Sequence, residues 1–369
     1  MTRINYALKQ LNLMNLIALK KFTYIILLLL VAFLSGCSVF VKTSTVANYS
    51  NLDKIDQTTT KNQVSILLGT PQGQGLFGQA GALKELDFYY GLAGEVGSGG
   101  LDYESGMAFV SYENEKPVEL IYFYSKATGK PFSRIENLSI KDISNSLLIG
   151  KSKYDDLIKL IGAPYYTGRR ANFPANINHS LGYWDASQIQ NNRAIKEKWL
   201  LVGYDSERII QDIIWVTSKP EDIKEFGNIT EQQIQNISRL NTSGFIPVSE
   251  VTGINMGANI DPVQVDALIR SQPKNIKEII NVLGQPNALG MKNFVENGIV
   301  NLSNWSFSTI EMKGREENYI PPNATPELKT RLGSTRSSFV VMKLDQSRLI
   351  VSHAANGEIK EILWEKAIK

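Results

Sequence analysis

The sequence contains one pattern three times, and this repetition constrains the fold more than any other feature. A helical stretch that ends in Gly-x-Pro occurs at residues 64–71, 157–164 and 279–286. When the copies are aligned on Gly69, Gly162 and Gly284, their apolar positions coincide at offsets of three and four residues, which places them on one helix face. The glycine favours the left-handed conformation that ends a helix, and the following proline prevents the helix from resuming.

The second half of each copy predicts β-structure. An aromatic strand follows each glycine, at residues 87–90, 182–184 and 304–307. A hairpin then ends in a similar closing strand, at residues 118–123, 210–215 and 359–364. Asn356-Gly357 is a pair that favours a tight hairpin turn. The sequence therefore predicts an α+β protein of three tandem two-layer modules, each with one or two short helices packed on a small antiparallel sheet.

The repeat also predicts the division of the chain. We expect a first module at 51–125, a second at 138–218 and a third at 250–369. A polar linker at 219–249 separates the last two, and the third module carries an inserted loop at about 313–332, a stretch that contains three prolines.

The N-terminal residues predict an export signal. Residues 1–36 hold four basic side chains and no acidic one, and residues 22–34 form an apolar run of thirteen residues. That run is too short for a helix that spans a membrane, which needs roughly 20 apolar residues. Translation could begin at Met1 or at Met14.

The signal ends in a sequence that resembles a bacterial lipobox, Leu34-Ser35-Gly36-Cys37, and Cys37 is the only cysteine of the chain. The resemblance implies that the peptide is cut before Cys37, which then carries diacylglycerol on its thiol and an acyl chain on its amino group. Residues 37–50 would form a tether. Ser38 stands where an aspartate would retain such a lipoprotein in the inner membrane, so we expect an outer-membrane protein anchored by lipid and facing the periplasm.

The charge of the mature chain excludes one class of partner. Removal of the signal lowers the formal net charge from +3 to −1, because it removes four basic side chains. Nucleic-acid binding normally needs a concentrated basic face, so we expect no nucleic-acid partner. With Cys37 lipidated, the chain holds no disulfide.

A lipobox, a helix ending in LLGTP, an aromatic strand and a closing hairpin together resemble the SmpA/OmlA family of outer-membrane lipoproteins, which includes the small lipoprotein of the β-barrel assembly machinery (BamE). The resemblance is best over residues 52–124. The same architecture occurs in tandem in the β-lactamase inhibitor protein. The resemblance implies a protein that binds partners through sheet surfaces and loops, and it supplies no catalytic residue. Members usually carry one module, whereas this chain carries three copies of the motif.

Aromatic side chains are the candidate binding residues. Adjacent strand positions point to opposite faces, so each aromatic pair should place one ring in the core and one on a more exposed face. The candidates are Tyr89, Tyr90, Tyr183, Trp184 and Trp305.

Polar chemistry in the sequence is sparse. His179 and His353 are the only histidines, and their spacing with carboxylates matches no metal motif, so we expect no metal site and structural or surface roles for both. No GxSxG-type nucleophile motif is present. The Arg169-Arg170 pair could meet an anion such as a lipid headgroup, although a solvated loop is the interpretation we favour.

These observations lead to one functional hypothesis and one alternative. The hypothesis is a non-enzymatic, lipid-anchored scaffold of the outer membrane that binds other envelope proteins. The only non-protein groups expected are the acyl chains on Cys37. The alternative is a periplasmic hydrolase or small-ligand carrier that uses a cleft between modules.

Overall fold

The computed structural model describes most of the chain after residue 38. Cys37 and the rest of Leu34-Ser35-Gly36-Cys37 lie outside the described residues. The described residues are 39–43, 49–97, 100–128, 135–139, 142–143, 146–173, 177–185, 188–190, 194–196, 198–218, 244–248, 251–257, 260–295, 298–317, 326, 330 and 338–368.

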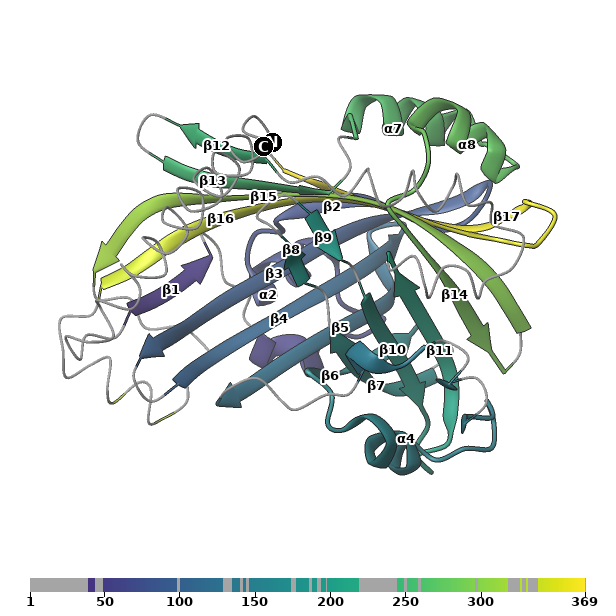
Figure 1. Ribbon diagram of the computed structural model, residues 1–369, viewed down its shortest axis with the longest axis horizontal. Helices are drawn as coiled ribbons and strands as arrows, with labels where there is room; N and C mark the ends of the chain where they lie inside the picture. The colour runs from purple at the N-terminus through teal and green to yellow at the C-terminus, as the bar shows by residue number, and fades with distance from the viewer. Residues whose placement is uncertain are drawn as a thin grey trace, which may run out of the picture.

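Twelve antiparallel strands form one closed barrel (Figure 1). In order around the wall they are β2 (Gly73–Gln79), β3 (Ala82–Gly97), β4 (Gly100–Glu113), β5 (Lys116–Thr128), β6 (Tyr166–Asn172), β7 (Ile177–Asp185), β10 (Lys198–Tyr204), β11 (Ile210–Thr217), β14 (Ala288–Phe294), β15 (Gly298–Glu317), β16 (Ser338–His353) and β17 (Ile359–Ala367). β17 pairs with β2, which closes the barrel.

The three sequence repeats each supply four of these strands. The first supplies β2 to β5, the second supplies β6, β7, β10 and β11, and the third supplies β14 to β17. Neighbouring repeats meet at three seams, which are the pairings β5–β6, β11–β14 and β17–β2. Each repeat therefore satisfies the backbone groups at the edges of the other two.

A glycine lies at the same position in each seam. An added Cβ would lie 1.7 Å from the Trp364 carbonyl oxygen at Gly75, 1.9 Å from that of Tyr122 at Gly168, and 2.0 Å from that of Trp215 at Gly290. All three glycines stand six residues after the glycine that ends the preceding helix. The seams thus need glycine because the facing backbone approaches too closely for any side chain.

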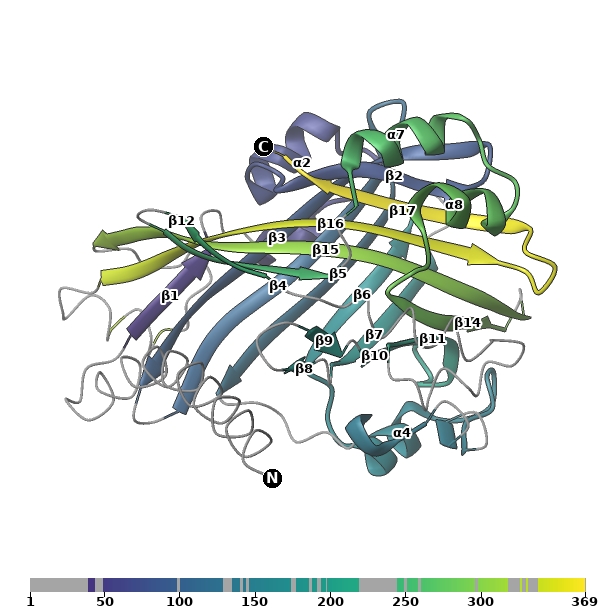
Figure 2. The same ribbon diagram turned by 45° about the horizontal axis from the view of Figure 1, so that its top comes forward.

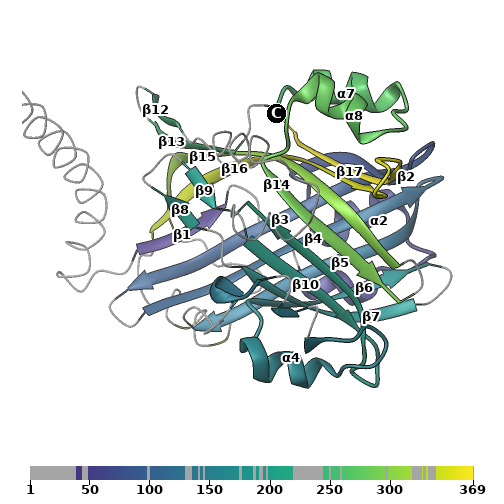
Figure 3. The same cartoon turned by 45° about the vertical axis from the view of Figure 1, so that its right-hand side comes forward.

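The helices lie on the outer wall of the barrel, as Figures 2 and 3 show from two directions. They are α2 (Lys61–Leu68), α4 (Tyr154–Ile161), α7 (Pro262–Arg270) and α8 (Ile276–Leu283). α2, α4 and α8 end at Gly69, Gly162 and Gly284, whose φ angles of 95°, 84° and 78° agree with the sequence argument for glycine. None of the described helices combines the length and the apolar character needed to cross a bilayer.

Each helical group covers outward-facing aromatic side chains of its own repeat. Trp184 and Trp215 lie under α4, while Trp305 and Trp364 lie under α7 and α8, and all four are fully buried. Tyr89 takes the corresponding place under α2. The indole N–H groups of Trp184 and Trp305 donate to the carbonyl oxygens of the helix-ending glycines, at 3.0 and 3.2 Å. These hydrogen bonds fix the ends of α4 and α8 to the sheet.

The prediction of three tandem two-layer modules is wrong, because the strands of all three repeats form one closed barrel. The helix-on-sheet pattern explains only how the outer face of each four-stranded stretch is buried. The inner face is apolar as well, so it must also leave water. Edge-to-edge pairing of the three stretches buries that second face and removes every open edge of the barrel wall.

The barrel has two different ends. At the hairpin end, short connections join β2 to β3, β4 to β5, β6 to β7, β10 to β11, β14 to β15 and β16 to β17. At the opposite end, which we call the long-strand end, β3, β4, β15 and β16 extend well beyond their neighbours (Figure 1). β15 includes residues 313–317, which the sequence placed in an inserted loop.

The segment after the predicted lipidation site contributes to the long-strand end. β1 (Val39–Thr43) pairs with both β16 and β3, with Val39 opposite Val96 near the far end of β3. Residues 39–43, expected to be part of a tether, thus form a strand of the main sheet. Four other strands complete the sheets, β12 (Gly244–Val248) and β13 (Val251–Gly257) beside β15, and the small hairpin β8 (Gln188–Gln190) with β9 (Ala194–Lys196). Two 3-10 helices, η1 (Tyr49–Lys54) and η2 (Ile135–Asn137), precede α2 and α4.

Candidate ligand-binding cavity

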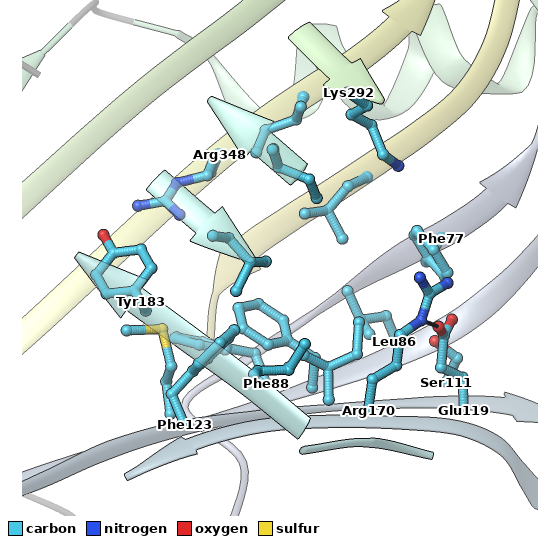
Figure 4. Close-up of a pocket in the computed structure, with 18 of the residues that line it drawn as sticks. Phe77, Leu86, Phe88, Ser111, Glu119, Phe123, Arg170, Tyr183, Lys292 and Arg348 are labelled. Atoms are coloured by element: carbon cyan, nitrogen blue, oxygen red, sulfur yellow. Dashed lines mark hydrogen bonds and ion pairs between the residues drawn. The ribbon is translucent and has the colours of Figure 1, made fainter. Parts of the chain in front are cut away.

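The inner face of the barrel encloses a cavity of about 190 Å³ (Figure 4). Every one of the twelve barrel strands contributes at least one lining side chain. An engineered apolar cavity of about 150 Å³ binds benzene, so this volume suits a small organic molecule.

The middle of the cavity is apolar, and its walls follow the threefold repeat. Strand register places one set of three equivalent side chains on the second strand of each repeat, another on the third strand and another on the fourth. These sets are Leu86, Leu181 and Leu302; Phe109, Leu201 and Ile350; and Ile121, Ile214 and Leu363. A ligand in the middle of the cavity would meet only hydrocarbon and aromatic surface.

Charged side chains form a ring toward the hairpin end. The last strand of each repeat supplies a carboxylate, at Glu119, Asp212 and Glu361. The first strands of the second and third repeats supply Arg170 and Lys292, and Phe77 holds that position in the first. We call these five charged residues the charged ring.

Ion pairs in the charged ring cross the interior of the barrel. Arg170 contacts Asp212 at 3.7 Å and Lys292 contacts Glu361 at 2.5 Å, and each pair joins the first and last strand of one repeat. The first repeat lacks a cation, and its Glu119 instead contacts Arg170 of the second repeat at 2.6 Å. Figure 4 shows Arg170 and Glu119 at one end of the cavity. The ring thus consists of two groups of ion pairs, Glu119 and Asp212 with Arg170, and Glu361 with Lys292.

Pairing and small neighbouring residues accommodate the buried charges of the ring. Burial would lower the pKa of Arg170, but the nearby Glu119 and Asp212 carboxylates reverse this, and the pKa of Arg170 lies above its usual value. A small residue also stands opposite each carboxylate on the neighbouring strand. At Gly203 an added Cβ would lie 2.0 Å from an Asp212 carboxylate oxygen, so glycine makes room for that side chain. The opposite charges of the ring therefore offset part of the cost of burying each of them.

The third repeat has a polar inner wall where the other two are mostly apolar. Toward the long-strand end, strand register gives three such positions. They are Asn304 in place of Phe88 and Tyr183, Arg348 in place of Met107 and Trp199, and Glu365 in place of Phe123 and Val216.

Glu365 differs from the carboxylates of the charged ring. It is fully buried, and neither of its carboxylate oxygens has a hydrogen-bond partner in the part of the chain that the structure describes. Burial raises the pKa of Glu365 to about 7, although the positive charge of Arg348 opposes the shift. Arg348 lies opposite Glu365 in the β16–β17 pair.

The structure divides the aromatic candidates into two groups. Tyr89, Trp184 and Trp305 are fully buried beneath the helices. Tyr90 and Tyr183 line the cavity, and burial raises the pKa of Tyr90 to about 12. The alternation of faces holds for both adjacent pairs, but the second face is the barrel interior and not the outer surface.

The other polar candidates also take definite places. Arg169 points outward toward Asp53, at 3.6 Å, whereas Arg170 belongs to the charged ring, so this pair lies on a strand and not in a loop. His353 contacts the Ser303 hydroxyl at 3.1 Å, and burial lowers the pKa of His353. His179 is half-buried on β7, opposite Arg170 on β6. Among the described residues, no three His, Cys, Asp or Glu side chains are grouped to hold a metal ion.

Fold and cavity together define a helix-covered, twelve-stranded antiparallel barrel whose cavity is apolar in the middle and charged toward the hairpin end. The sequence matches no known protein family, and searches of curated proteins and of solved structures return no match. The resemblance to the SmpA/OmlA family thus stays a prediction.

Sequence reasoning missed the charged ring and Glu365. A signal for the charged ring was present in the closing strands, where VELIYF, IQDIIW and IKEILW each carry a carboxylate three or four residues before the closing aromatic residue. In a two-layer sandwich those carboxylates would face solvent. Closure of the barrel turns the same face inward.

Proposed function

We propose that this protein binds a small apolar molecule inside its barrel. The cavity carries the proposal, since all twelve strands line it and its middle is apolar. This is the small-ligand alternative of the sequence analysis, moved from a cleft between modules to the barrel interior. The scaffold hypothesis has less support, because the aromatic side chains expected to bind partners are buried or line the cavity.

We further propose that the barrel is a lipoprotein whose long-strand end lies close to the outer membrane. Cys37 stands two residues before β1, and β1 begins opposite Val96 at the long-strand end. Two extended residues span roughly 7 Å. An acylated Cys37 would therefore hold this end of the barrel near the bilayer, where apolar molecules concentrate, and the charged ring would lie at the far end.

Toluene is a suitable probe of the cavity, because its size matches the volume and its ring suits the aromatic lining. A ligand that binds only the folded state raises the melting temperature as its concentration exceeds Kd. We expect toluene to raise the melting temperature of the wild-type protein. Leu201→Phe, which adds bulk to the cavity wall, should remove most of that increase.

Ile66→Phe is the matched control. Ile66 is 73% exposed on α2, so this substitution adds the same ring outside the barrel. It should retain the full response to toluene. A wild-type protein that does not respond to toluene, or an equal response in all three proteins, would refute binding in the cavity.

The anchor has a separate test. We expect the mature protein, purified from outer membranes, to begin at Cys37 and to carry the mass of a diacylglycerol and one further acyl chain. Cys37→Ala should release the protein from the membrane fraction. An unmodified mature N-terminus would contradict the anchor and leave the cavity proposal standing.

A further inference from the structure

The inner wall of the third repeat departs from the other two in a way that folding does not explain. At the position of Glu365, the first two repeats carry Phe123 and Val216, which fill the barrel with hydrocarbon. An apolar side chain in the third repeat would satisfy the same packing. The carboxylate instead brings a strongly polar group into a buried site, which is costly unless that group finds a partner.

The other carboxylates that face the interior have basic side chains as partners. Glu119 and Glu361 contact Arg170 and Lys292 at 2.6 and 2.5 Å. Glu365 has no equivalent contact among the described residues, even though Arg348 lies opposite it across the strand pair. Among the described carboxylates that face the interior, Glu365 is thus the one whose two oxygens both lack a hydrogen-bond partner.

Glu365 also lies next to the cavity. Leu363 precedes it on the same face of β17, and Leu363 and Arg348 both line the cavity. Alternation along the strand directs the side chains of Glu361, Leu363 and Glu365 to the barrel interior. Glu365 does not itself line the cavity, so its carboxylate would lie just beyond the lining, at the long-strand side of a molecule in the apolar middle.

We propose that Glu365 is the polar anchor for the ligand of the barrel, and that this ligand is a small apolar molecule with one hydrogen-bond-donating head group, a hydroxyl or an amine. The apolar body would lie against the Leu86, Leu181 and Leu302 layer, and the head group would donate to the Glu365 carboxylate. This inference rests on the proposed cavity function and adds the chemical class of the ligand.

The test compares toluene with benzyl alcohol and benzylamine, which add a donor to the same ring. We expect Glu365→Leu to weaken the binding of benzyl alcohol or benzylamine at least tenfold more than it weakens the binding of toluene. A factor of ten corresponds to about 1.4 kcal/mol. Phe123→Leu is the control, because it changes the equivalent position of the first repeat without removing a carboxylate. It should change the Kd values for all three probes by similar factors.

The possible results separate this inference from the proposed function. Equal effects of Glu365→Leu on all three probes would overturn the role of Glu365 and leave the cavity function intact. Failure of every probe to bind the wild-type protein would overturn both. If Glu365→Leu does not fold, Glu365→Gln supplies the same comparison with benzylamine, whose ammonium group should lose at least tenfold in affinity when the negative charge is removed.

Discussion

Closure of the barrel can be tested by adding a single Cβ atom at a seam between repeats. Gly168 lies on β6 at the seam with β5, and its substitution by alanine would put a Cβ 1.9 Å from the carbonyl oxygen of Tyr122. That distance is roughly 1.5 Å shorter than ordinary van der Waals contact. The facing atom belongs to the backbone, so no side chain can rotate away. The two strands must separate or bend.

The cost follows from the contacts that separation would disturb. Overpacking of a well-packed site costs about 1–3 kcal/mol, and each seam hydrogen bond that weakens contributes about 0.5–1.5 kcal/mol. We therefore expect Gly168→Ala to lower the free energy of unfolding by about 2–4 kcal/mol. Urea denaturation followed by tryptophan fluorescence measures this difference.

A neighbouring substitution separates the seam from strand propensity. Thr167→Ala changes the adjacent, exposed residue of the same strand, and it should cost less than about 1 kcal/mol. The reasoning would be refuted if Gly168→Ala were as stable as Thr167→Ala. Separate modules predict that outcome, because β5 and β6 would then belong to different domains that need not pair.

Three further predictions follow from the seams and the buried charges. Arg170→Met should lower the free energy of unfolding by about 3–5 kcal/mol, since it leaves Glu119 buried without its cation, and adding Glu119→Gln should restore part of the loss in a double-mutant cycle. Glu365 has a pKa of about 7 in the folded protein, against an ordinary value of 4.5, so the folded state holds that proton more tightly than the unfolded chain. This tighter proton binding contributes on the order of 3 kcal/mol to the free energy of unfolding, which is fully present below about pH 4.5 and is lost as the pH rises through 7. Glu365→Gln should remove this pH dependence from urea titrations between pH 4.5 and 8. Gln74→Cys with Lys366→Cys should form a disulfide across the β17–β2 seam in a Cys37→Ala background, and a non-reducing gel that shows only free thiols would contradict barrel closure.

The sequence predicted local structure well at the helix ends. Gly69, Gly162 and Gly284 all have the positive φ expected of glycine at the end of a helix. Helix periodicity and glycine chemistry depend on neighbouring residues, and these are visible in a single stretch of sequence. Gly357 likewise takes a positive φ in the turn between β16 and β17, as its pairing with Asn356 indicated.

The sequence could not predict closure by the same reasoning, because closure depends on pairing between residues far apart in the chain. Gly75 and Trp364 meet at one seam, although almost three hundred residues separate them in the sequence. One signal was available. The strand at 198–204, KWLLVGY, is apolar on both faces, whereas a strand in a two-layer sandwich should alternate between apolar and polar residues.

The sequence identified aromatic residues of the candidate site, but it could not show that they line a cavity, because that depends on closure of the barrel. Each aromatic pair was expected to place one ring in the core and one on a more exposed face, without a choice between the two, and Tyr90 and Tyr183 are the rings that line the cavity. Their expected role at an outer surface came from the assumption that this face meets solvent. Once the barrel closes, the same alternation predicts a ligand cavity.

The threefold repeat provides a physical way to separate folding from function in this barrel. Positions where all three repeats agree, such as the seam glycines and the apolar layer of Leu86, Leu181 and Leu302, have one explanation, which is the closed and packed wall. The charged ring departs from the repeat at Phe77, and the structure compensates because Glu119 contacts Arg170 of the next repeat. Glu365 departs from the repeat and has no hydrogen-bond partner inside the described protein, so that partner is best sought among the molecules that the cavity admits.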